Sequence, residues 1–234
     1  MPADRKLSEL SKKALSILQN SPLSVEILQL AAKTSKRASE FTPTQHAPAA
    51  QLNLQRLAAS TTLSVNQDKI ALHAWTEANY MLNDFIMSET DLNLEALLKL
   101  HKALLPAVGG AIRQTDLQGG NSKYPPYKDL QHLWEIFDSL ILHNQAVTDP
   151  ILFAAQIYQW LISLHFFDDA NGRLARLSAD WVLTSAGIPP ISFDNDAASF
   201  VSVLDEVRKY DINTAVIRIC QGINGSLDIL EQKS

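Results

Sequence analysis

The chain has 234 residues, of which 46% are apolar and 19% charged, and its formal net charge is −5. This length fits one domain, or one domain with a small appendage, and this composition is typical of globular proteins. The acidic balance argues against a general nucleic-acid-binding function, which shows as a basic excess. Cys220 is the single cysteine, so no intrachain disulfide can form and no oxidising compartment is indicated.

The N-terminal part of the chain is predicted to hold two helices and a linker. Apolar residues recur at helical spacing over 7–19 and 24–36, and Ser24 is a good N-cap for the second helix. Two prolines then fall within 40–50, which is typical of a linker. We therefore expect an N-terminal helical extension with its linker, residues 1–50, followed by a catalytic domain, residues 51–234.

The middle of the chain is predicted to be helical with one interruption. Helical periodicity resumes at Gln51 and covers 68–87, 91–105 and 130–143. Between the second and third of these helices, pairs of glycines and prolines bracket the short stretch 112–118, which is too short for a helix of any length. The plainest prediction for it is a small β-hairpin or an extended flap.

The C-terminal half contains the helix that we expect at the centre of the fold. Asp149-Pro150 opens a helix over 151–164 that is apolar nearly all round, as in the middle of a bundle. A break at 165–171 separates it from a helix over 172–186, and two further helices are expected over 197–210 and 214–232. The predicted fold class is all-α with one small β element.

The break at 165–171 opens a segment of unusual chemistry, HFFDDANGRLAR, over residues 165–176. His165 leaves the end of a buried helix and can act as a base. Asp169, four residues later, can hold a hard cation such as Mg²⁺. Asn171 and Gly172 form a tight turn at a helix N-terminus, where free backbone N–H groups and the helix dipole attract phosphate.

Two arginines follow on the same helix face. Arg173 and Arg176 lie three residues apart, so both can reach polyphosphate oxygens, and Asp180 could brace Arg176 one turn later. A base, a carboxylate, an anion site and paired arginines are what transfer from a nucleotide to a hydroxyl requires. The alternative is a satisfied helix-end histidine beside a solvated basic face. It explains poorly why these groups gather between two apolar helices.

The segment resembles the signature of Fic (filamentation induced by cAMP) domains, His-Pro-Phe-x-(Asp/Glu)-Gly-Asn-Gly-Arg-x-x-Arg. The matching positions are His165, Phe167, Asp169, Asn171, Gly172, Arg173 and Arg176. Weaker similarity extends over residues 52–220. The resemblance implies a Fic-type helical bundle with a small β-hairpin flap. It also implies a protein adenylyltransferase that uses ATP and Mg²⁺ to place AMP on a Tyr, Thr or Ser hydroxyl of a target protein.

The resemblance also implies a role for each matching residue. His165 would deprotonate the target hydroxyl, and Asp169 would bind Mg²⁺ between the α- and β-phosphates. The nucleotide would be held by Ala170, Asn171, Gly172, Arg173 and Arg176, with Phe200 and Leu204 against the adenine. The flap, about 113–123, would hold the target segment by strand addition, which uses backbone more than side chains. Its residues are Arg113, Thr115, Asp116, Leu117 and Gln118.

Two residues depart from the signature. Phe166 replaces its proline, and a bulky apolar residue can simply pack there. Ala170 replaces its first glycine, so a Cβ could crowd the phosphate or restrict φ. Alanine also stands there in Doc-type kinases, but these have lysine where this chain has Gly172. Gly172 favours AMP transfer. The alternatives are a Fic-fold module that binds a nucleotide or partner with little turnover, a Fic enzyme with another donor, and a Doc-like kinase.

The resemblance bears on regulation and partners as well. Many Fic proteins carry an inhibitory helix with a glutamate that pairs with the second signature arginine. In this chain Ser60 begins the corresponding run and Ser64 stands where glutamate is expected, which indicates a degenerate inhibitory motif; the alternative is a polar turn before a helix. A second copy of the chain or an antitoxin is open as a further partner.

The chain opens with no apolar leader, and no apolar run reaches the roughly 18 residues of a membrane span. We therefore expect a cytoplasmic protein with neither a nucleic-acid nor a membrane partner.

Overall fold

The structure is a computed structural model of the chain, and it describes residues 7–20, 22–41, 68–117, 124–192 and 211–232. The described residues form helices and connecting segments and contain no strand. The all-α prediction is therefore confirmed for them, whereas the predicted β-hairpin is not seen. The helices are α1 (Glu9–Asn20), α2 (Val25–Ser39), α4 (Asp68–Met87), α5 (Leu94–Leu104), α6 (Tyr127–Val147), α7 (Pro150–Leu164), α8 (Asn171–Ser185) and α10 (Ile212–Glu231).

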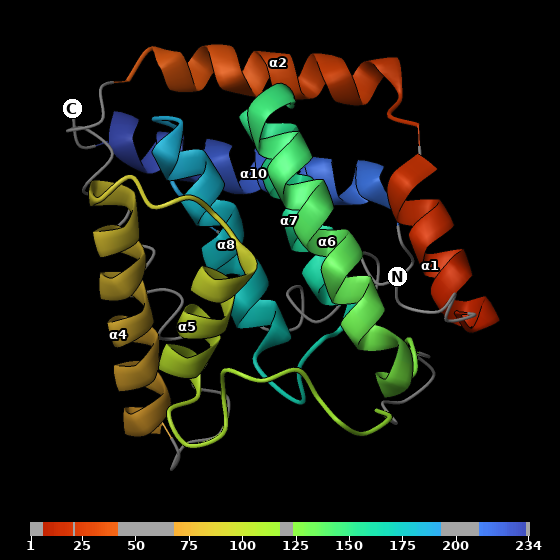
Figure 1. Cartoon of the computed structure of the whole chain (residues 1–234). Helices are drawn as coiled ribbons and strands as arrows, with labels where there is room; N and C mark the ends of the chain where they lie inside the picture. The colour runs from red at the N-terminus through yellow and green to blue at the C-terminus, as the bar shows by residue number, and fades with distance from the viewer. Residues whose placement is uncertain (1–6, 21, 42–67, 118–123, 193–210, 233–234) are drawn as a thin grey trace.

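Helix α7 is the centre of the fold, as its apolar sequence predicted. It begins where the side chain of Asp149 accepts hydrogen bonds from the N–H groups of Ile151 and Leu152, with Pro150 in the first turn. Its side chains are buried along nearly the whole length. It packs on α8, α10 and α6, and Figure 1 shows it in the middle of the bundle, behind α6.

Helices α4 and α5 pack on each other and on α8. The bounds of α4 agree with the predicted 68–87, but α5 begins at Leu94 rather than at Asp91. The reason is the Asn93 side chain, which accepts a hydrogen bond from the N–H of Ala96 at 3.0 Å and so acts as the N-cap. Helix α6 begins three residues earlier than the predicted Leu130, directly after Pro126.

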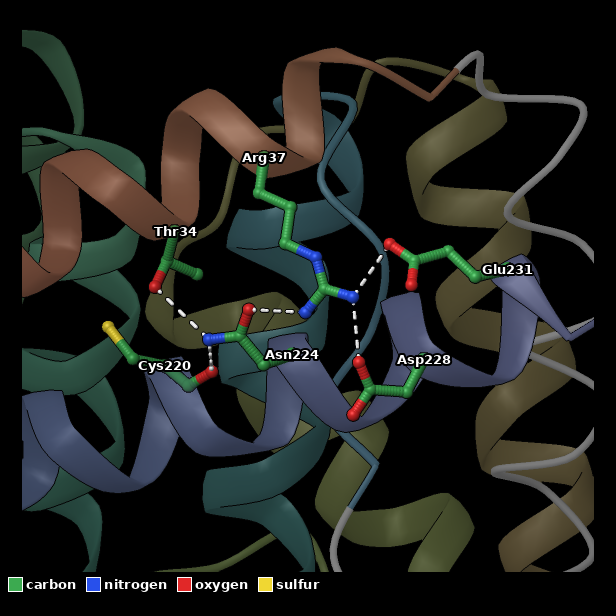
Figure 2. A network of polar contacts seen from close by, with 6 residues as sticks. All are labelled: Thr34, Arg37, Cys220, Asn224, Asp228 and Glu231. Atoms are coloured by element: carbon green, nitrogen blue, oxygen red, sulfur yellow. Dashed lines mark hydrogen bonds and ion pairs between the residues drawn. The ribbon is translucent and has the colours of Figure 1, made fainter.

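Helix α2 lies across the top of the bundle in Figure 1 and packs on α10. A polar network joins the two helices, as Figure 2 shows. The Arg37 guanidinium donates to Asp228 and to Glu231, both at 2.7 Å, and to Asn224 at 2.9 Å. Asn224 in turn donates to Thr34 on α2 at 3.3 Å. The predicted extension therefore contacts the last helix of the chain directly.

Helix α1 is held at its N-terminal end by α6. The Asp129 carboxylate accepts hydrogen bonds from the Ser8 N–H at 2.9 Å and from the Ser11 hydroxyl at 2.6 Å. Burial alone would raise the pKa of Asp129, but these hydrogen bonds and the nearby Lys128 charge outweigh it and lower the pKa below its ordinary value.

The division of the chain into an extension and a catalytic domain at residue 50 remains a prediction. None of the described helices is long and apolar enough to cross a bilayer.

Candidate active site

The candidate site lies where α7 ends and α8 begins, at the lower end of the bundle in Figure 1, beside the segment that connects α5 to α6. His165 terminates α7 in a left-handed conformation, with φ 52° and ψ 59°. Its Nδ1 lies 3.3 Å from the carbonyl oxygen of Ile162. Because a carbonyl oxygen only accepts, Nδ1 is the donor in this contact, and in the neutral ring the lone pair is then on Nε2. This tautomer suits a base.

An aromatic ring from the α5–α6 segment stacks on the His165 imidazole. The ring of Tyr124 lies 4.2 Å from it, centroid to centroid, with 26° between the planes. Sequence reasoning missed this residue. Tyr124 lies outside the helical periodicities and outside the 165–176 segment, so no local signal marked it.

Two phenylalanines anchor the loop that follows His165. Phe166 is fully buried, with its ring edge-on to Trp134 at 4.7 Å and 5.6 Å from the ring of Phe137. Phe167 is also fully buried and packs edge-on to Trp134 at 5.7 Å. Phe166 therefore fills an aromatic pocket, as expected for a bulky residue in place of the signature proline.

A buried histidine outside the predicted set supports the same loop. His101 accepts a hydrogen bond at Nδ1 from the N–H of Gly110, at 2.9 Å. Its hydrogen is therefore on Nε2, which donates to the carbonyl oxygen of Asp169 at 3.0 Å. Burial lowers the pKa of His101 and favours this neutral form, and its ring stacks on Phe167 at 3.8 Å. Sequence reasoning assigned His101 no role.

Asn171 braces the loop with its side chain. Its Oδ1 accepts from the N–H of Phe167 at 3.1 Å, and its Nδ2 donates to the carbonyl oxygen of Phe167 at 2.8 Å. The residue is 2% exposed. The implied phosphate-cradling role of Asn171 is therefore confined to its backbone, because the amide group is engaged within the loop.

Ala170 precedes α8 in a left-handed conformation, with φ 61° and ψ 11°. An L side chain rarely adopts this backbone, which explains why the signature has glycine here. The N–H of Ala170 donates to the carboxylate of Asp169 at 2.5 Å. A phosphate bound at this turn would therefore be held by the first backbone N–H groups of α8 itself, which have no partner within a helix.

Asp169 and Arg173 face each other at the entrance to α8. The Oδ2 of Asp169 lies 3.3 Å from the guanidinium of Arg173, and the aspartate side chain is 71% exposed. Mg²⁺ is usually bound by one or two carboxylates together with substrate phosphates. An exposed carboxylate beside a helix N-terminus fits this requirement, so Asp169 can hold such a cation.

Arg176 lies deeper, with its guanidinium 5.9 Å from the centre of the Trp75 ring and its Nε donating to the carbonyl oxygen of Gly172 at 3.3 Å. Burial lowers its pKa to about 10, so it stays protonated at neutral pH. Burial raises the pKa of Asp180 to about 7. Asp180 accepts a hydrogen bond from the N–H of Ile191 at 2.8 Å, and its charge favours the protonated form of Arg176. The predicted support of Arg176 by Asp180 is thus seen as an electrostatic interaction that favours the charged guanidinium.

The predicted flap residues differ in exposure, and their role toward a target stays a prediction. Arg113 is 1% exposed, and its guanidinium donates to backbone carbonyl oxygens inside the protein, so its side chain is not presented at the surface. Thr115 and Asp116 are exposed and Leu117 is partly buried. The carboxylate of Asp116 accepts from the N–H of Tyr127 at 2.8 Å, which joins the middle of the α5–α6 segment to the first residue of α6.

Several predicted residues lie outside the described ranges, so the structure does not place them. These are Gln118 of the flap, Phe200 and Leu204 of the adenine site, and Ser60 and Ser64 of the degenerate inhibitory motif.

Comparison with known proteins gives relatives of one kind. Residues 91–183 match the model of the Fic/DOC family. The chain is 36% identical over 193 residues to a uridine 5'-monophosphate transferase of Xanthomonas campestris pv. campestris. The aligned region covers 74% of this chain and 36% of the relative. It is 29% identical over 153 residues to the protein adenylyltransferase Fic of Aedes aegypti, covering 63% of this chain and 30% of the relative. The chain thus spans about a third of the length of these relatives.

Solved structures show the same fold. Fic-1 of C. elegans (aa134–508) superposes with a TM-score of 0.69 at 18% identity, covering 96% of this chain and 73% of that chain. IbpAFic2, in a structure where it is covalently tethered to Cdc42, superposes with a TM-score of 0.65 at 17% identity, covering 92% and 75%. At this identity the likeness concerns the fold alone.

Proposed function

This chain contains a Fic/DOC domain, and we propose that it transfers AMP from ATP onto a hydroxyl side chain of a target protein. The observation that carries the proposal is the arrangement around His165. Nδ1 faces the carbonyl oxygen of Ile162, and the ring lies at the junction where the N-terminus of α8 would bind an anion.

The residues present account for both halves of the reaction. Nε2 of His165 takes the proton of the acceptor hydroxyl while the hydroxyl oxygen attacks the α-phosphorus. The bond from that phosphorus to the oxygen bridging to the β-phosphate breaks. Pyrophosphate leaves with the electron pair, and the proton remains on His165. General-base catalysis of this kind typically contributes about 10²–10⁴-fold in rate.

The donor would be held by α8 and its arginines. The first backbone N–H groups of α8, the guanidinium of Arg173 and that of Arg176 are the phosphate ligands in this proposal. Asp169 would hold Mg²⁺, which when bound neutralises phosphate charge. Asp169 and Arg173 pair with each other in this structure. When the donor binds, Asp169 would exchange Arg173 for Mg²⁺, and Arg173 would exchange Asp169 for a phosphate. Phe200 and Leu204 remain proposed contacts for the adenine.

A uridine nucleotide is a second candidate donor. The relative that matches at 36% identity is named a uridine 5'-monophosphate transferase, whereas the Aedes aegypti adenylyltransferase matches at 29%. Ala170 also departs from the signature at the turn that faces the donor. With UTP the chemistry at His165 would be the same and UMP would be transferred.

The acceptor is proposed to be a protein segment held beside His165 by the α5–α6 connection, where Thr115 and Asp116 are exposed. A cytoplasmic site of action belongs to this proposal, because nucleoside triphosphates and Mg²⁺ are its requirements. A second copy of the chain or an antitoxin remains open as a further partner.

The test uses nucleotides labelled at the α- or at the γ-phosphate. Wild-type protein with Mg²⁺ is incubated with each of ATP and UTP, with the chain itself and a mixture of cell proteins as acceptors. We expect α-label, and no γ-label, to become covalently attached to protein. His165→Ala should lower the rate about 10²–10⁴-fold and leave the nucleotide Kd nearly unchanged. His73→Ala, at an exposed position on α4, is the matched control.

The two donors and the alternatives give different outcomes. Label from UTP in place of ATP would make UMP the transferred group, and transfer of γ-label would indicate a kinase. Nucleotide binding by a folded wild-type protein without transfer of either label would refute the enzyme and leave a binding module. Unimpaired transfer by His165→Ala would remove His165 from the mechanism.

A further inference from the structure

Arg113 is a buried cation whose hydrogen bonds reach three separate parts of the chain. Its Nε donates to the carbonyl oxygen of His165 at 2.8 Å, Nη1 to that of Thr115 at 2.6 Å, and Nη2 to that of Pro125 at 2.6 Å. Its backbone N–H donates to the carbonyl oxygen of Phe166 at 2.9 Å. One residue thus joins the α7–α8 loop to the middle and to the C-terminal end of the α5–α6 segment.

A guanidinium is costly to bury unless its donors are satisfied. Here each of its three nitrogens donates to a backbone carbonyl oxygen, and burial lowers the pKa of Arg113 despite the nearby charges of Asp116 and Asp168. The donors form a rigid planar fork, so the carbonyl groups must hold fixed positions around it. The backbone at His165, Thr115 and Pro125 is therefore held in a fixed relative geometry by the one guanidinium.

Two of these contacts lead to the base. The carbonyl oxygen of His165 itself is held by Nε. The carbonyl oxygen of Pro125 is held by Nη2, and the residue before it, Tyr124, is the one whose ring stacks on the His165 imidazole. The backbone of the base and the ring that lies on it are therefore both fixed to the same side chain.

We propose that Arg113 is a positioning residue: it sets the orientation of the His165 imidazole, and it holds the acceptor-binding segment at a fixed separation from that ring. This inference rests on the proposed function for its effect on rate. Its structural part, the coupling from Arg113 to His165, does not. Arg113 acts on the reaction through His165, Thr115 and Pro125, and its buried side chain does not touch the target.

The structural part can be tested by NMR without any substrate. An aromatic ring stacked on an imidazole shifts the imidazole resonances by its ring current, so the His165 ring signals report the Tyr124 contact. Protein with isotope-labelled histidine rings is prepared as wild type, Arg113→Lys, Arg113→Gln and Tyr124→Leu, and His165→Ala assigns the signal. Arg113→Lys keeps the positive charge but cannot span three carbonyl groups, and it serves if Arg113→Gln does not fold.

We expect the His165 signals of Arg113→Lys to move toward those of Tyr124→Leu. Gln114→Ala, an exposed neighbour on the same segment, should leave them unchanged. In the transfer reaction Arg113→Lys should lower kcat on the order of 10- to 100-fold, as for a base displaced by a fraction of an ångström to an ångström, while the nucleotide Kd stays within about twofold.

The outcomes separate this inference from the proposed function. If the wild type transfers nothing, the proposed function fails, and the NMR comparison alone decides whether Arg113 positions His165. His165 signals that coincide in wild type and folded Arg113→Lys would overturn the inference. Shifted signals with an unchanged kcat would also overturn it, because the position of the ring would then not matter to the reaction.

Discussion

Replacement of Phe166 by alanine tests whether the departure from the signature is built into the core. The ring is fully buried, edge-on to Trp134 at 4.7 Å and 5.6 Å from Phe137. Loss of a buried phenylalanine ring costs about 3–5 kcal/mol of the free energy of unfolding, because apolar burial is lost and a cavity remains. Phe166→Leu keeps most of the volume but loses the ring contacts, so it should cost about 1–2 kcal/mol.

The cavity would open at the residue next to the base, since Phe166 follows His165, and the carbonyl oxygen of Phe166 accepts from the backbone N–H of Arg113. Urea unfolding at constant slope measures the stability change, and the transfer reaction measures kcat, which should fall as well. Phe85→Ala is the control. It removes a ring that stacks on Trp181 at 5.1 Å, away from the base, and should lower stability without lowering kcat. A Phe166→Ala protein within 1 kcal/mol of wild type would refute the packing argument.

Two further predictions concern the N-terminal helices. Arg37→Met should lower the free energy of unfolding by about 1 kcal/mol, because its partners Asp228 and Glu231 are more than half exposed; the loss, measured by urea unfolding, should shrink in high salt, and salt-independence would contradict an ionic contribution. The pKa of Asp129 is depressed, so its contribution to stability is present above the unfolded pKa of about 3.9 and is lost as pH falls through the lower, folded value. Asp129→Asn should therefore reduce the pH dependence of stability below about pH 4, and an unchanged slope would contradict the assignment.

The sequence predicted those parts of the structure that local pattern determines. The apolar run after Asp149-Pro150 indicated a central helix, and α7 is that helix. The candidate site was predictable because its main residues fall within one contiguous segment, 165–176, that forms the loop and the first turns of α8. The capping of α5 by Asn93 places the start of that helix at Leu94, three residues after the predicted Asp91.

The contacts that sequence reasoning missed are long-range. His101 reaches the backbone of Asp169 across 68 residues, and Arg113 reaches His165 across 52. No periodicity or turn signal records such pairs. Paired glycines and prolines around 112–118 indicated a reversal of the chain, but they could not show whether a strand ladder or side-chain bonds would hold it. In the described residues the side chains of Arg113 and Asp116 bond the two limbs of this segment to each other, and the backbone N–H of Arg113 bonds to the carbonyl oxygen of Phe166.

The contact between α2 and α10 also affects how the chain folds as it is synthesised. Arg37 and its partner Asn224 are 187 residues apart, and the buried face of α2 rests on the last helix of the fold. Domains generally fold as units, and exposed apolar surface makes unfinished chains prone to aggregate. Helix α2 leaves the ribosome long before α10 has been synthesised. Until then, the apolar face of α2 lacks α10 as its packing partner. Packing of α2 on α10 is therefore expected to be a late step in the folding of these residues.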